Sequence, residues 1–223
     1  GRDGRVARSG VVLNDRPWRR PGTYCTIPSL HYHCRIMRLP NGRVRKFRRS
    51  SEDPGCAHEL TFSCYRRLPL LSRDRTRRWS LESLDRARHE HDLELWAYVI
   101  MPEHAHVLFF PRNLEYRIRT ILQAIKQPVM RRAINYLKEH NPGWLDRLCI
   151  KPGDSPHFWQ PGGGYDRNIN CAATAWHVVE YIHNNPVRRS LASCPTDWAW
   201  SSARWYAGLD DVVLPMDAAP PPR

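Results

Sequence analysis

The sequence predicts an α+β fold: an antiparallel sheet in the ferredoxin-like split βαβ arrangement, helices on one face of that sheet, and an extra C-terminal helix. Two observations support this prediction. Segments with apolar residues at every second position alternate along the chain with segments whose apolar residues recur three or four positions apart. The order of these segments is strand, helix, strand, strand, helix, strand, helix.

The first half of the pattern contains three strands and a helix. Residues 58–65 alternate, with Leu60, Phe62 and Cys64 on one face, which is typical of a half-buried strand. Ser80 is suited to capping a helix over residues 80–91. The β-rich runs 93–101 and 104–111 follow closely on one another, so a hairpin is expected.

Helices dominate the second half. Residues 114–139 have helical spacing, and Pro128 is expected to break this stretch into two helices. A fourth strand is expected at 157–160 or slightly beyond. Asn170 is then expected to cap a helix over 170–184, which Pro186 terminates.

Charge and composition divide the 223 residues into three parts. Residues 1–55 form a basic arm rich in Pro, Gly and Arg, with no sustained periodicity, and are expected to be disordered. Thirteen Lys and Arg against two Asp in residues 1–50 give this arm most of the net charge of +13. Such a polycation attracts phosphate backbones, although it also occurs as a solvated tail. Residues 56–209 form the expected catalytic domain, and 210–223 an expected disordered tail.

Two function classes are disfavoured. No stretch approaches eighteen consecutive apolar residues, so no membrane span is expected. The seven cysteines are scattered and odd in number, which indicates reduced thiols rather than a disulfide framework. A cytoplasmic protein is therefore expected. Together with the basic arm, we expect a protein of bacterial type that associates with the nucleoid.

A pair of histidines offers a metal site on the second strand of the hairpin. Side chains alternate along a strand, so Ala105 and Val107 face the helices while His104 and His106 share the opposite face. Two imidazoles in this position can bind one cation. The same spacing also occurs in ordinary surface histidines.

The last helix adds a phenol and an amide. Tyr181 and Asn185 are four residues apart and project from one side, away from a packing stripe that includes Val178 and Ile182. A phenol is mostly protonated at neutral pH and is a weak nucleophile without a nearby cation. A tyrosine at the boundary of the core, with its hydroxyl in water, is the alternative interpretation.

Three separated strings resemble one family. YVIMPEHAHVLFF, EYIHNNPVRRSL and WAWSSARWY resemble, in this order, the REP-associated tyrosine transposases, which belong to the HUH nucleases named for their His-hydrophobic-His pair. HFWQPGGGYDRNI resembles the family's segment before the tyrosine helix. The resemblance runs from about Cys56 to Ala207 and leaves the basic arm uncovered.

The resemblance implies roles for four residues. His104 and His106 match the metal pair, Asn185 the third ligand and Tyr181 the nucleophile, with Mg²⁺ or Mn²⁺ as the metal. It implies single-stranded DNA with hairpins as the substrate, cut to leave a 5′-phosphotyrosine, and a homodimer is possible. Glu103 stands where the family commonly has Asn, and would either support the ligands or only complete the turn.

Basic residues of the matching region are candidate DNA contacts, with solvated surface charge as the alternative. They are Arg66, Arg67, Lys126, Arg131 and Arg132. A non-catalytic DNA- or RNA-binding protein of ferredoxin-like fold is the rival interpretation of the whole chain. The histidines on the open face disfavour the RNA-binding version, because such modules place aromatic residues there.

Overall fold

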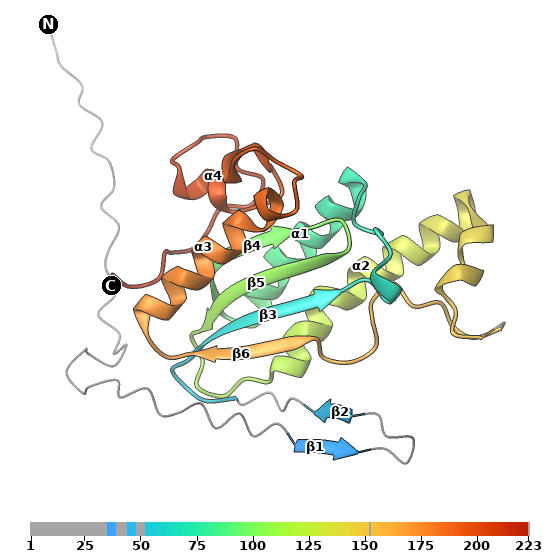
Figure 1. Ribbon diagram of the computed structural model, residues 1–223, viewed down its shortest axis with the longest axis horizontal. Coiled ribbons are helices and arrows are strands. Elements are labelled where there is room, and N and C mark those ends of the chain that lie inside the picture. The colour runs from blue at the N-terminus through green and yellow to red at the C-terminus, as the bar shows by residue number, and fades with distance from the viewer. Residues whose placement is uncertain (1–34, 39–43, 48–51, 152, 223) are drawn as a thin grey trace, which may run out of the picture. The chain divides into compact units, whose positions relative to one another are not determined.

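The computed structural model describes residues 35–38, 44–47, 52–151 and 153–222. Its main sheet is antiparallel and has the strand order β4-β5-β3-β6, as Figure 1 shows. The strands are β3 (Ala57–Ser63), β4 (Leu93–Ile100), β5 (His104–Pro111) and β6 (Tyr165–Ile169). With a helix after β3 and another after β5, this order is the predicted ferredoxin-like arrangement.

The two central strands follow the predicted alternation. On β3 and β5 every second side chain enters the core between the sheet and the first two helices. These side chains are Leu60, Phe62, Ala105, Val107 and Phe109, each no more than 3% exposed. The other side chains of both strands therefore face the opposite side of the sheet.

Helix α1 (Asp74–Glu90) begins six residues before the predicted Ser80 cap, so that predicted boundary is wrong. Ser80 is buried inside the helix, where its hydroxyl donates a hydrogen bond to the Thr76 carbonyl at 2.9 Å. A serine bonded to the preceding turn no longer serves as a cap. Asp74 in the first turn suits the positive end of the helix dipole.

Helix α2 (Ile118–His140) is one helix, and the predicted break at Pro128 is wrong. Proline has no amide hydrogen, so the Ala124 carbonyl one turn earlier loses its helical partner. The Ser83 hydroxyl of α1 donates a hydrogen bond to this carbonyl at 3.2 Å. The neighbouring helix thus satisfies the acceptor that the proline leaves unpaired.

Strand β6 begins five residues beyond the end of the predicted segment 157–160, of which only Trp159 forms an isolated bridge, with Cys64. Gly164 precedes the strand with φ of +77° and passes so close to β3 that a Cβ there would lie 2.3 Å from the Thr61 carbonyl oxygen. Only glycine allows this approach. It brings the chain into register with Tyr165 opposite Thr61.

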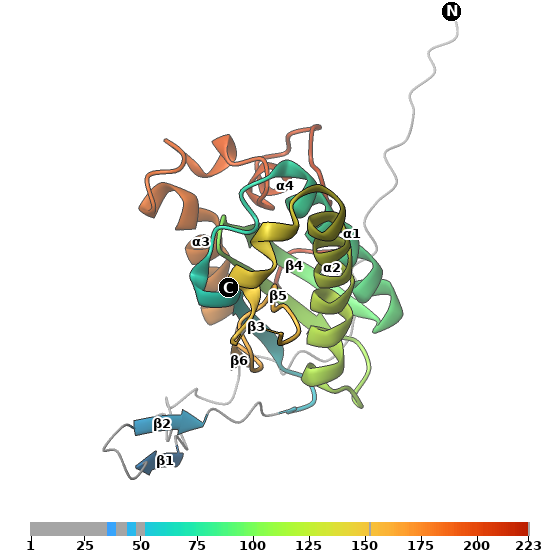
Figure 2. The same ribbon diagram turned by 90° about the vertical axis from the view of Figure 1, so that its right-hand side faces the viewer.

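Helix α3 (Ala172–Arg188) continues past Pro186, where the sequence predicted its end. The proline lies in the last turn, and the Arg189 amide still bonds to the Asn185 carbonyl at 3.1 Å. Figures 1 and 2 show α1 and α2 on one face of the sheet, as predicted, and α3 across the other. The extra helix therefore covers part of the face that carries the histidines.

The C-terminal segment 210–222 is packed on the domain, contrary to the predicted disordered tail. Leu214 and Met216 are 5% and 7% exposed and belong to the core. The Tyr98 hydroxyl donates to the Leu214 carbonyl, and the Asp217 amide to the Leu95 carbonyl. Two apolar residues are too few to show a periodicity in the sequence, although they suffice to anchor the segment.

Two short strands lie within the predicted arm. Strands β1 (Arg35–Arg38) and β2 (Val44–Phe47) pair with each other in antiparallel register, and Asn41-Gly42 in the sequence between them is a hairpin signal. The prediction of disorder does not hold for these strands, and most of the remaining arm lies outside the described residues.

No helix in the described part of the chain is long and apolar enough to cross a membrane. Short helices complete the chain: η1 (Tyr65–Arg67), η2 (Pro142–Trp144), η3 (Asp146–Leu148), η4 (Pro195–Asp197) and α4 (Ala203–Tyr206).

Candidate functional site

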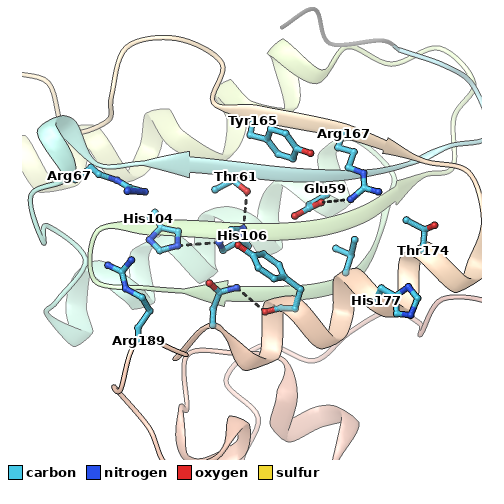
Figure 3. A pocket seen from close by; sticks show the side chains of 13 residues that line it. Glu59, Thr61, Arg67, His104, His106, Tyr165, Arg167, Thr174, His177 and Arg189 are labelled. Carbon is cyan, nitrogen blue, oxygen red and sulfur yellow. Dashed lines mark hydrogen bonds and ion pairs between the residues drawn. The ribbon is translucent and has the colours of Figure 1, made fainter. Parts of the chain in front are cut away.

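A cavity of about 710 Å³ lies between α3 and the sheet face that carries the histidines (Figure 3). Strands β3, β5 and β6 and helix α3 contribute to its walls. The four residues predicted for the chemistry all line it: His104, His106, Tyr181 and Asn185. The convergence of the imidazoles and the phenol, which the sequence could only suggest, is thus a feature of the structure.

The two imidazoles face each other through their Nε2 atoms, which are 3.1 Å apart. Each Nδ1 has a different partner. That of His104 lies 3.1 Å from the Glu103 carboxylate, and that of His106 lies 2.8 Å from the Thr61 hydroxyl. A ring whose Nδ1–H donates to such a partner presents a lone pair on Nε2. The hydrogen bonds to Glu103 and Thr61 therefore orient both rings so that their Nε2 atoms, which could bind a metal, point toward each other.

Burial favours the neutral form of both imidazoles. Each histidine is 5% exposed. Loss of hydration and, to a lesser extent, the neighbouring His104 lower the pKa of His106 to about 3. Burial also lowers the pKa of His104, where Glu103 opposes the effect and Arg67 and Arg189 reinforce it. Neutral imidazoles are the form that binds cations.

Glu103 connects His104 to the end of α3. Its carboxylate accepts a hydrogen bond from Arg189 at 2.6 Å, while the same oxygen contacts His104 Nδ1. Arg189 immediately follows the helix and lines the cavity. Glu103 was expected either to support the metal ligands or only to complete the turn. Its contact with His104 favours the first interpretation.

Tyr181 extends from the middle of α3 toward the histidine pair. Its ring meets that of His106 edge-on, with 5.4 Å between centroids and 88° between planes. The Arg188 guanidinium carbon lies 5.4 Å from the centre of the same ring. The residue is 40% exposed, while Val178 and Ile182 in the packing stripe of the same helix are buried. The phenol is thus accessible from the cavity rather than packed in the core.

Asn185 lies one turn after Tyr181 and is 7% exposed. Its amide nitrogen donates to the Tyr181 carbonyl at 2.8 Å, which assigns the other amide atom, Oδ1, as an available acceptor. Among the described residues no group of three or more His, Cys, Asp or Glu side chains could hold a metal. Two neutral imidazoles and one amide oxygen nevertheless form a donor set that fits a divalent cation with open positions.

The predicted basic contacts are divided between separate surfaces. Arg67 lines the cavity, and Arg66 beside it lies over the Tyr65 ring. Lys126 instead lines a second cavity beside α2, where it donates to the Gly162 carbonyl at 3.3 Å. Arg131 and Arg132 are exposed on α2, and Arg132 pairs with Glu82 of α1. Of the five, the structure places only Arg67 at the histidine pair.

Several lining residues, including Thr61, Glu59 and Arg167, were not singled out from the sequence. Thr61 contacts His106, and Glu59 lies beside Arg167 of β6. The alternation of β3 already placed Glu59 and Thr61 on the face opposite the core. The register against β5 and β6, which sets their neighbours, was the information that the sequence lacked.

Comparisons with known proteins show a shared fold. No protein-family model and no curated protein matches the chain. A solved structure of a REP-associated tyrosine transposase bound to a REP hairpin is 22% identical, with a TM-score of 0.55 over 72% of this chain and 86% of that one. A putative transposase from Deinococcus radiodurans R1 is 21% identical, with a TM-score of 0.39 over 66% of this chain and 97% of that one.

Proposed function

We propose that this chain is a metal-dependent endonuclease and strand transferase for single-stranded DNA, which cuts through a 5′-phosphotyrosine intermediate in DNA transposition. One observation carries the proposal: the Tyr181 ring contacts the ring of His106, whose Nε2 faces that of His104 in a shared cavity. A nucleophile beside a metal-binding pair is an arrangement that can cleave a phosphodiester.

Each residue has a distinct role in this reaction. The Tyr181 oxygen attacks phosphorus and forms the phosphotyrosine bond, while the bond to the 3′ oxygen breaks. This oxygen takes a proton from water and becomes a 3′-hydroxyl. The phenol proton passes to water, which reaches this partly exposed side chain. Arg67 and Arg189 line the cavity and offer positive charge to the phosphate. In the reverse reaction a 3′-hydroxyl attacks the phosphotyrosine, which rejoins the strand.

The cation site consists of His104, His106 and Asn185. Their Nε2 and Oδ1 atoms would hold Mg²⁺ or Mn²⁺, which when bound withdraws charge from the phosphate. Glu103 and Thr61 orient the two rings through their contacts with the Nδ1 atoms. The neutral state of the buried imidazoles supports this assignment.

Hairpin DNA is the proposed substrate class. Its support is the fold shared with a protein whose structure contains a REP hairpin, together with the motif resemblance around His104 and Tyr181. The basic arm would add affinity without reading sequence. Strand transfer would operate on DNA that flanks such hairpins.

A labelled oligonucleotide tests the proposal. A single-stranded hairpin DNA carrying a 3′-terminal dye is incubated with the protein and Mn²⁺, then separated on a denaturing gel. Cleavage with a 5′-phosphotyrosine leaves the 3′ label on the protein, whereas a 5′ label is released on a shorter strand. Binding without any covalent complex, across a panel of hairpins, would support the rival non-catalytic DNA-binding protein. Stronger binding of hairpin RNA than of hairpin DNA would support the RNA-binding version.

A further inference from the structure

We infer that Glu59 and Arg167 form a base-reading subsite that selects guanine in the strand entering the cavity. The inference rests on the proposed function, because it takes the ligand to be single-stranded DNA. It adds a specificity determinant that takes no part in the cleavage chemistry.

Glu59 is an unusual residue for a cavity that receives a phosphate chain. It lines the cavity beside the histidine pair, and its side chain is only 8% exposed. Among the described residues its only polar partner is Arg167, with 3.9 Å between Nη1 and Oε2, beyond hydrogen-bonding distance. Burial raises the pKa of Glu59, and Arg167 partly opposes this effect. A poorly solvated carboxylate gains most from ligand groups that donate hydrogen bonds.

The register of the sheet places Arg167 and an aromatic ring next to this carboxylate. On β6, Arg167 is opposite Glu59 and Tyr165 is opposite Thr61, so both side chains share the cavity face. Figure 3 shows Glu59 and Arg167 joined across the two strands, with Tyr165 beside them. Tyrosine rings on such sheet faces serve as stacking platforms for unpaired bases.

Guanine matches this combination of groups. The Watson–Crick edge of guanine presents two adjacent donors, N1–H and the N2 amino group, next to the O6 acceptor. A carboxylate accepts from both donors at once, and a neighbouring guanidinium donates to O6. Adenine, cytosine and thymine each lack a second adjacent donor on this edge. The Glu59 carboxylate therefore discriminates against all three.

Binding selection with a cleavage-blocked protein tests the subsite. Full-length Tyr181→Phe protein, chosen to block covalent capture, selects from single-stranded oligonucleotides with a randomised centre. Guanine should be enriched at one position. The added Glu59→Gln change should lower the preference for guanine there about tenfold, because the amide replaces one acceptor by a donor. Glu139→Gln, at an exposed site on α2, is the matched control and should leave the preference unchanged.

A ligand change gives a second test that does not depend on folding of a variant. Inosine lacks the N2 amino group, so placing it at the selected position should weaken binding roughly fivefold to tenfold in the Glu59 protein. The penalty should disappear in Glu59→Gln. A uniform base preference, a guanine preference that survives Glu59→Gln, or equal binding of inosine and guanine would each overturn the inference. Guanine selection without any covalent adduct of the unaltered chain would uphold the subsite while refuting the proposed cleavage.

Discussion

The Nε2 atoms of His104 and His106 lie 3.1 Å apart in a buried site, which is hydrogen-bonding distance when one of the two nitrogens carries a hydrogen. Thr61 at Nδ1 of His106 can either donate or accept a hydrogen bond. The ring can therefore move its hydrogen from Nε2 to Nδ1 without a change of charge. Both nitrogens that face the centre would then offer lone pairs.

The first prediction concerns pH. Burial lowers the pKa of both histidines, so both stay neutral as the pH falls below the ordinary imidazole value. Mn²⁺ affinity, measured by titration calorimetry, should change less than about twofold between about pH 7.5 and 6.0. Two imidazoles with ordinary pKa values near 6.5 would lose affinity about tenfold over this interval. A loss of that size would show that the pair titrates as exposed side chains do.

Removal of the carboxylate behind His104 should weaken the metal site. Glu103→Ala leaves Nδ1 without its acceptor and frees Arg189. Mn²⁺ affinity should fall roughly 10- to 100-fold. Glu103→Gln retains a carbonyl acceptor and should lose less. Equal affinities for the unaltered protein and Glu103→Ala would reduce Glu103 to a turn residue.

Thr61 provides the corresponding test on His106. Thr61→Val keeps the shape of the side chain but removes the hydroxyl that lies 2.8 Å from Nδ1. Mn²⁺ affinity should fall about tenfold, while Thr61→Ser, which retains the hydroxyl, should stay close to the unaltered protein. Calorimetric titration of both variants under the same conditions makes this comparison. Equal losses in the two variants would mean that packing of the threonine methyl group matters rather than its hydroxyl.

Local patterns in the sequence predicted the sheet and one face of the site. Alternation at Ala105 and Val107 placed both histidines on the face opposite the core, and the helix spacing of Tyr181 and Asn185 placed these two together. Such periodicities arise from backbone geometry within a single element. These periodicities do not depend on contacts with other helices or strands, so they can be recognised in the sequence alone.

The sequence-based predictions failed where the stabilising contact came from a residue far away in the chain. Pro128 stays within a helix because Ser83 of another helix bonds the freed carbonyl. The subsite pair Glu59 and Arg167 is set by strand register, which no local pattern specifies. Leu214 packs on a core that is formed almost entirely by earlier residues. Each of these depends on tertiary contacts.

The C-terminal segment should contribute measurably to stability. Leu214→Ala removes a side chain that is 5% exposed, and should lower the free energy of unfolding by about 2–4 kcal/mol. Val213→Ala, next to it and 47% exposed, should change that free energy by less than about 0.5 kcal/mol. Urea unfolding followed by circular dichroism compares the two. Equal unfolding midpoints would show that the segment is not anchored in solution.

The most direct test of the account is the yield of covalent protein–DNA complex from the Tyr181→Phe variant. Tyr165→Phe, a change of the same size in the same cavity, is the control. With 3′-labelled hairpin DNA and Mn²⁺, the unaltered protein and Tyr165→Phe should both form the complex. Tyr181→Phe should form none, while it binds the same hairpin within a few-fold. A covalent complex that persists in Tyr181→Phe would contradict the role assigned to this phenol.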